Sequence, residues 1–165
     1  MPPKAVHWIA ISCLWLAACS GGKPVVIAPG AFSADWPSAL RAELVSSKKC
    51  ALDRINEKNP HEQRLSFKSG AKLHMSGWAV PKKEDLHTPL YVQLVGPART
   101  YTALAQQRTK RPDVNHALKT DNSLDAGFDM IATAQLKPGE YAIQTLQPEG
   151  DDVTQCDTNV IITIN

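Results

Sequence analysis

The segment 72–80 reads KLHMSGWAV, and its pattern of apolar residues decides the fold class. Leu73 and Met75 alternate with polar residues, and the alternation resumes at Trp78 after a slip of one residue at Gly77. A period of two is typical of a β-strand with one buried face. The slip at Gly77 predicts a β-bulge in this strand.

Similar short segments recur along the chain, and Pro- and Gly-containing turns separate them. The expected strands lie at 52–55, 64–68, 90–95, 100–105, 127–134, 140–146 and 159–164. No alternation of strands with helices suggests a parallel sheet. The sequence therefore predicts an all-β fold, an immunoglobulin-like antiparallel sandwich of about seven or eight strands.

Two segments outside these strands have helical features. Residues 35–49 predict a short amphipathic helix capped by Asp35, and the alternative is a linker that rests Trp36 and Leu40 on the domain. Residues 106–126 form a long irregular stretch, in which Pro112 suits a first helical turn.

The expected helix in 106–126 is one or two turns long and bridges the two sheets. Asp113 suits its first turn, and Val114, Ala117 and Leu118 are expected to face inward.

The N-terminus has the build of an export signal. An apolar stretch of about 12 residues follows Lys4 and is shorter than the roughly 20 residues that span a bilayer. The run LAAC ending at Cys19 resembles the lipobox of bacterial lipoproteins, which implies a signal peptide at 1–18 and lipidation of Cys19 with chains such as palmitate. An ordinary cleaved signal peptide is the alternative. Because Ser20 and not Asp follows the Cys, the resemblance implies an outer-membrane protein facing the periplasm.

A Gly- and Pro-rich tether is expected at 19–34, and the sandwich domain at 50–165. Cys13 leaves with the signal and Cys19 carries lipid, so Cys50 and Cys156 are the remaining pair. In an oxidising compartment they predict a disulfide that fastens the two ends of the sandwich. Such a bridge stabilises by up to about 4–5 kcal/mol. A metal pair or a reactive thiol is the competing interpretation.

Composition argues against several functions. Without Lys4 the chain has 17 basic and 16 acidic residues, too balanced for a nucleic-acid partner. The sequence contains no Gly-x-Ser-x-Gly, phosphate loop or His-x-x-x-His, so we expect no enzyme, no cofactor and no metal. The histidines outside the signal are scattered: His61, His74, His87 and His116. A catalytic pair of carboxylates that face each other across a cleft is the enzymatic arrangement that the sequence leaves open.

Several motifs between residues 50 and 164 occur in a fixed order. They are CALDRIN at 50–56, SGWAV at 76–80, RTKRPDV at 108–114, AGF at 126–128 and PGEY at 138–141. This set resembles a small β-sandwich module attached to bacterial surface-polysaccharide enzymes, such as glycosyltransferases and O-antigen acyltransferases. The resemblance implies a sandwich fold and an accessory role without catalysis.

Each motif residue has a structural and a functional interpretation. Trp78 is expected to be a core aromatic between the sheets, and a platform for a sugar is the alternative. Arg108, Arg111 and Asp113 predict an ion pair that organises their loop, or else a ligand grip. With Tyr101, these four residues are the candidate ligand-binding set. Tyr141 is expected to bond backbone as a corner tyrosine.

The sequence thus predicts a lipid-anchored, non-catalytic binding or accessory module of the cell envelope. The expected partners are the membrane, through the lipid, and an envelope polysaccharide or a protein that handles one. A structural or protein-interaction lipoprotein, including an inhibitor of an exogenous enzyme, is the alternative, and a hydrolytic enzyme is the third possibility. The sequence leaves the oligomeric state open.

Overall fold

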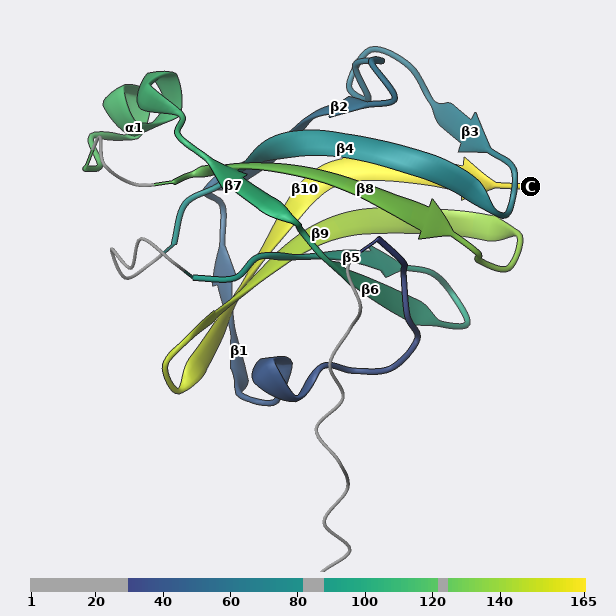
Figure 1. Ribbon diagram of the computed structural model, residues 1–165, viewed down its shortest axis with the longest axis horizontal. Coiled ribbons are helices and arrows are strands. Elements are labelled where there is room, and N and C mark those ends of the chain that lie inside the picture. The colour runs from purple at the N-terminus through teal and green to yellow at the C-terminus, as the bar shows by residue number, and fades with distance from the viewer. Residues whose placement is uncertain (1–29, 82–87, 122–124) are drawn as a thin grey trace, which may run out of the picture.

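The computed structural model describes residues 30–81, 88–121 and 125–165, and it confirms an all-β sandwich with 56% strand and 8% helix (Figure 1). The predicted signal peptide, Cys19 and most of the tether lie outside the described residues. The elements are η1 (Ser38–Leu40), β1 (Glu43–Ser47), β2 (Cys50–Ile55), β3 (Leu65–Phe67), β4 (Ala71–Ala79), β5 (Tyr91–Val95), β6 (Thr100–Leu104), β7 (Gln107–Thr109), α1 (Pro112–Leu118), β8 (Gly127–Ala134), β9 (Gly139–Glu149) and β10 (Asp152–Ile164).

The strands form two sheets. One has the order β1-β10-β9-β5-β6, with β3 also paired to β10, and the other has the order β2-β4-β8-β7. The expectation of a purely antiparallel sandwich was wrong at two places, because β1 and β3 both run parallel to β10. β9 occupies one edge of β10, so β1 and β3 share its other edge at opposite ends of this long strand.

The alternation in β4 continues without a break through Gly77. Gly77 therefore faces the core, and Trp78 faces outward and is half-buried, which corrects the expectation of a core Trp. The predicted bulge exists beside Gly77, but its extra residue is Asp53 on the neighbouring strand β2, where the register shifts between Leu52 and Arg54.

At two successive positions, a glycine on one of the strands β4 and β8 pairs with an aromatic residue on the other. Gly77 lies opposite Phe128, and Trp78 lies opposite Gly127. A Cβ at Gly77 would collide with the carbonyl oxygen of Ala51 and lie 3.0 Å from the Phe128 ring. The buried ring of Phe128 thus occupies the space that a side chain at position 77 would need.

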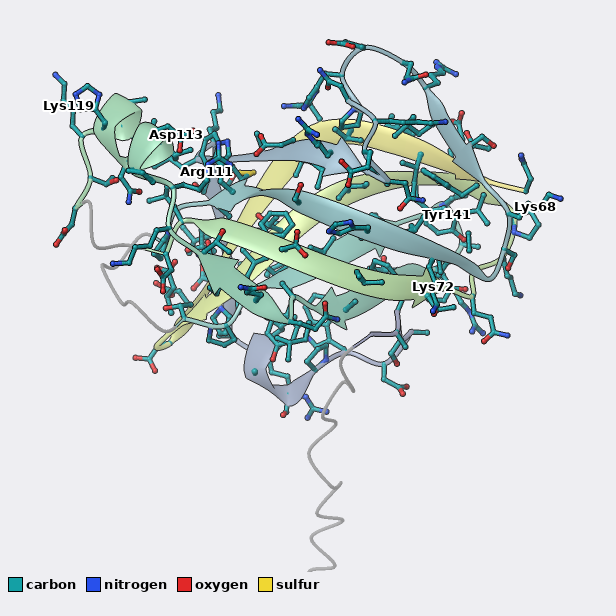
Figure 2. All side chains as sticks on the ribbon, turned by 45° about the horizontal axis from the view of Figure 1, so that its top comes forward. Lys68, Lys72, Arg111, Asp113, Lys119 and Tyr141 are labelled. Carbon is teal, nitrogen blue, oxygen red and sulfur yellow. A yellow bond between two sulfur atoms is a disulfide. The ribbon has the colours of Figure 1, made fainter. Side chains whose placement is uncertain are left out.

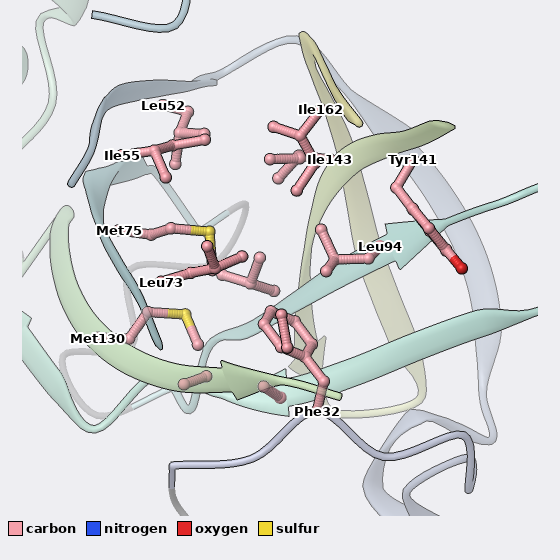
Figure 3. Close-up of a cluster of buried hydrophobic side chains, with 14 of the residues drawn as sticks. Phe32, Leu52, Ile55, Leu73, Met75, Leu94, Met130, Tyr141, Ile143 and Ile162 are labelled. Atoms are coloured by element: carbon pink, nitrogen blue, oxygen red, sulfur yellow. The ribbon is translucent and has the colours of Figure 1, made fainter. Parts of the chain in front are cut away.

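The core lies between the sheets (Figure 3). Its two open sides are closed differently. On one side, Ala31 pairs with Thr133 of β8, Ser33 pairs with Thr102 of β6, and Phe32 between them is only 8% exposed. The end of the expected tether is therefore part of the fold.

On the opposite side, a disulfide between Cys50 of β2 and Cys156 of β10 joins the two sheets, with the Cα atoms 6.2 Å apart. This confirms the predicted pair. Cys156 lies inside β10 and not before it, because β10 begins at Asp152.

The helix expected at 35–49 was largely wrong. One 3-10 turn forms at η1, and the chain then continues as β1 along the free edge of β10. Leu40 packs on the outer face of the six-stranded sheet against Tyr91, Leu146 and Val153. Pairing with β10 satisfies the backbone of β1, and this gain outweighs the weak helical spacing of its apolar residues.

The helix expected within 106–126 is confirmed as α1, but two details differ. Val114 is buried as predicted, whereas Ala117 is exposed. The helix does not bridge the sheets, because it connects β7 to β8 within the same sheet. Lys119 ends it in the left-handed conformation, with φ of 54°.

Gly77→Ala is expected to lower the free energy of unfolding by about 1–3 kcal/mol, because the added methyl group overpacks the Phe128 ring. Ser76→Ala, one residue away on the outer face, is the control and is expected to change it by less than about 0.5 kcal/mol. Urea denaturation of the oxidised chain measures both values. Equal stability of Gly77→Ala and the unmodified chain would contradict the proposed packing.

Candidate functional site

Four of the five predicted ligand residues gather near α1. Arg111 is the N-cap residue of this helix and Asp113 lies in its first turn, whereas Tyr141 lies at the far end of the sandwich (Figure 2). Trp78 and Arg108 belong to the same end. Trp78 packs against the buried cluster that contains Val114, and Arg108 donates a hydrogen bond to the carbonyl oxygen of Ala79.

Tyr101 is separate from this group. It is 6% exposed, and its ring packs edge-on against Tyr141 with the centroids 6.0 Å apart. The Tyr141 hydroxyl donates to the carbonyl oxygen of Lys137 at 2.8 Å, as expected for a corner tyrosine. Both rings are therefore parts of the core, and burial raises the pKa of Tyr141.

Arg111 is held between two carboxylates. Its guanidinium donates to Asp53 at 2.6 Å and to Asp113 at 2.8 and 2.9 Å. Its stem and Thr109 together fill the space over Gly127, where a Cβ would collide with Oγ1 of Thr109 and lie 2.8 Å from Cγ of Arg111. Hydrogen bonding to Arg111 lowers the pKa of Asp113 to about 2, and the two carboxylates raise the pKa of Arg111.

Arg108 is tied to backbone. Its Nε and Nη2 donate to the carbonyl oxygen of Asp125, and Nη2 also donates to that of Ala79 at 3.1 Å. Burial lowers its pKa to about 10. Its Nη1 is buried without a hydrogen-bond partner in the part of the chain that the structure describes, so it is not offered to solvent. Both arginines thus direct most of their N–H donors to acceptors within the protein.

An apolar cluster completes this end of the sandwich. Val80, Val114 and Ala126 are buried together, and Trp78 and Leu118 pack against them. The contacts of Trp78, Arg108, Arg111 and Asp113 favour the structural interpretation of these residues, which hold α1 against the four-stranded sheet.

A groove of 370 Å³ lies elsewhere, between the β2–β3 connection and the outer face of β9 and β10. Its lining residues are Pro60, His61, Glu62, Gln63, Arg64, Glu140, Asn159, Ile161 and Thr163. We call this the β10 groove. Sequence reasoning missed it, because the groove forms only when β3 pairs with β10, and no local pattern in the sequence predicts that pairing.

The β10 groove combines exposed polar groups with one apolar side chain. Arg64 and Glu140 lie 3.8 Å apart with side chains 94% and 64% exposed, so this ion pair contributes little and both ends remain accessible. Ile161 is 57% exposed on the floor. Charged and amide groups around an apolar surface can hold a polar ligand such as a sugar, whose hydroxyls need donors and acceptors.

The wall of the groove is braced from within. The backbone N–H of His61 donates to Asn59, which in turn donates to Glu62 at 2.9 Å. An imidazole nitrogen of His61 lies 3.0 Å from the carbonyl oxygen of Leu52. Opposite, Asn159 takes a positive φ of 58°, which Asn tolerates better than most residues. These contacts shape the groove before any ligand arrives.

A second polar cluster lies on the outer face of the four-stranded sheet. His74 contacts Asp129 at 2.9 Å and lies 3.8 Å from Glu57. Across residues 30–81, 88–121 and 125–165, no group of three or more His, Cys, Asp or Glu side chains is arranged to hold a metal ion. Within the same ranges, no helix has the length and apolar character needed to cross a membrane.

No protein-family model, curated protein or solved structure matches this chain.

Arg111→Ala is expected to raise the pKa of Asp113 from about 2 towards its ordinary value of 3.8, because the ionised carboxylate loses its main partner. In the unmodified chain, the stability from this pair is present above pH 3.8 and is lost as the pH falls towards 2. Carboxyl carbon shifts measured by NMR titration report the pKa.

Arg54→Ala is the control for this titration, since Arg54 pairs with Glu57 and not with Asp113. If Asp113 keeps a pKa of about 2 without Arg111, hydrogen bonding to Arg111 is not what lowers that pKa.

Proposed function

We propose that this chain is a lipid-anchored, non-catalytic binding module of the cell envelope, and that it binds an envelope glycan in the β10 groove. The observation that carries the proposal is the contrast between two sites. The guanidinium of Arg111 near α1 is already paired with Asp53 and Asp113, whereas the polar groups of the β10 groove are exposed.

The chemistry of the groove supports a glycan. Carboxylate, guanidinium and amide groups from Glu140, Arg64 and Gln63 provide both acceptors and donors. Ile161 offers an apolar surface for the carbon face of a sugar ring. The volume of 370 Å³ suits one or two sugar units of a longer chain. The ordered motifs between residues 50 and 141, which resemble those of modules attached to polysaccharide enzymes, suggest the same ligand class.

The lipid anchor rests on the LAAC run at 16–19 and on the Gly- and Pro-rich segment that follows. Two or three acyl chains at Cys19 would hold the domain stably at a membrane, which one chain does not. Retention beside its target would then compensate for weak binding at a shallow groove.

A second candidate function is protein interaction. Ile161 at 57% and Ile131 at 51% are exposed large apolar residues, and protein partners bury such side chains. These two residues lie on different sheets, so they do not form one continuous patch. The glycan proposal therefore has the stronger support.

The double variant Arg64→Ala/Glu140→Ala is expected to weaken glycan binding at least tenfold, since it removes a donor and an acceptor from the groove without changing net charge. Calorimetric titration with soluble envelope oligosaccharides, released from peptidoglycan and from surface polysaccharide, measures the affinity. The matched control is Arg54→Ala/Glu57→Ala, which removes another exposed Arg–Glu pair outside the groove and is expected to stay within twofold.

Equal losses in both double variants would remove the groove from the proposal. Binding that is lost in Arg111→Ala but kept in the groove variant would return the site to the α1 end. A chain that binds none of these oligosaccharides, yet forms a saturable complex with a purified envelope protein through Ile161, would favour the second candidate.

Cys19→Ser is expected to abolish incorporation of labelled palmitate and to move the chain from the membrane fraction to the soluble fraction, because the thiol that accepts the lipid is gone. Cys13→Ser is the control and is expected to keep the label. Labelling followed by mass spectrometry of the mature N-terminus makes the measurement. A mature chain that begins elsewhere and carries no lipid would contradict the anchor.

A further inference from the structure

A second hollow continues the β10 groove along the outer face of β9 and β10. Its volume is 230 Å³, and its lining residues are Ala142, Asp157, Asn159, Val160 and Ile161. Asn159 and Ile161 also line the β10 groove, so the two hollows meet at these residues. We call the second one the Asp157 hollow.

The strand register places the two hollows in one row. Along β9, Glu140 lines the β10 groove and Ala142 lines the Asp157 hollow. Gln144 follows, and its partner on β10 is Asp157. These alternate residues of β9 face outward, because Tyr141 between the first two is buried in the core. Two residues of a strand span about 7 Å, so the row from Glu140 to Gln144 is about 14 Å long and runs parallel to the strands.

A β-bulge in β10 holds the polar groups of the Asp157 hollow in place. The register with β9 shifts between Asp157 and Val160, and Asn159 takes a positive φ of 58°. The backbone N–H of Asn159 donates to the carboxylate of Asp157 at 2.7 Å. The hydroxyl of Thr158 donates to the carbonyl oxygen of Ile143 at 2.7 Å. Asp157 and Asn159 are both exposed, so the bulge presents a carboxylate and an amide to a ligand.

The open part of this face ends beyond Gln144. The side-chain amide of Gln155 donates to the amide oxygen of Gln144 at 2.7 Å. Leu146, the next outward residue of β9, is buried against Leu40 of η1. A ligand on this face therefore reaches from the β10 groove to Asp157 and stops where η1 covers the sheet.

Acidic side chains outnumber basic ones along the row. Glu62 and Glu140 line the β10 groove, and Asp157 lines the second hollow. Arg64 is the one Lys or Arg among the described residues that line the two hollows, and it lies 3.8 Å from Glu140. Because like charges repel, an acidic group on a ligand is disfavoured over Asp157, whereas hydroxyl and amino groups find an acceptor there.

We infer that the β10 groove and the Asp157 hollow together bind several linked units of a linear glycan laid parallel to β9 and β10, and that the unit over the Asp157 hollow carries hydroxyl or amino groups and no acidic group. The inference rests on the proposed function for its ligand class. The shared lining and the strand register support the length of the ligand, and the exposed carboxylate of Asp157 supports its charge.

Calorimetric titration with ligands of different length tests the reach of the site. The probes are the soluble envelope oligosaccharides, separated into disaccharides and hexasaccharides and, by anion exchange, into neutral and acidic fractions. We expect neutral hexasaccharides to bind at least tenfold more tightly than neutral disaccharides, since they also contact the Asp157 hollow.

Ala142→Leu narrows the Asp157 hollow beside Ile161. It is expected to remove at least fivefold of the gain in affinity with length, and to leave disaccharide binding within twofold, which also shows that the variant is folded. Ser76→Leu adds the same side chain to the outer face of the other sheet and is expected to leave both affinities within twofold.

Asp157→Asn tests the charge preference. Its amide keeps an oxygen that can accept the backbone N–H of Asn159, so the bulge is retained while the charge is removed. The unmodified chain is expected to bind neutral hexasaccharides at least fivefold more tightly than acidic ones, and Asp157→Asn is expected to reduce this difference at least twofold. Asp151→Asn, at an exposed residue between β9 and β10, is the control and is expected to keep the difference.

Three results would overturn the inference and leave the proposed function intact. They are equal affinities of disaccharides and hexasaccharides, a gain with length that Ala142→Leu does not reduce, and tighter binding of the acidic hexasaccharides than of the neutral ones. Loss of binding to every fraction would contradict the proposed function itself and the inference with it, so the two failures are distinguishable.

Discussion

The pairing of glycine with an aromatic residue at two successive positions of β4 and β8 is the constraint on which the rest of the structure depends. The ring of Phe128 occupies the space beside Gly77, and Thr109 together with the stem of Arg111 occupies the space beside Gly127. A shift of β8 by one residue would turn Phe128 outward, away from the space beside Gly77. The register of the four-stranded sheet, the position of α1 and the ion pairs of Arg111 all follow from this pairing.

The same constraint explains why the most conspicuous motifs of the sequence do not form an open site. The bulge at Asp53, next to Gly77, places this carboxylate on Arg111. Arg108 donates hydrogen bonds to the carbonyl oxygens of Ala79 and Asp125. These residues are occupied in building one end of the domain. The exposed polar groups lie in the β10 groove, and the proposed function is placed there for that reason.

Much of the fold was predictable, because it depends on local alternation. Strand β8 follows directly from the pattern at 127–134, and the disulfide follows from removing Cys13 and Cys19 from the count. Strand β1 was not predictable, since its apolar residues have helical spacing and its pairing with β10 is distant in sequence. The outward position of Trp78 was missed because Gly77, which has no side chain, looked like a break in the alternation when it was an inward position filled by Phe128. The β10 groove depends on parallel pairing of β3 with β10, which no local pattern encodes.

Mapping of amide chemical shifts during titration with soluble envelope oligosaccharides tests the central claim most directly, because it locates the ligand without any substitution. The account predicts that the largest shifts fall on residues 60–64 and 159–163, which line the β10 groove. Shifts centred on residues 108–118 and on the indole of Trp78 would contradict it, because the ligand would then bind beside α1, at Arg108 and Arg111.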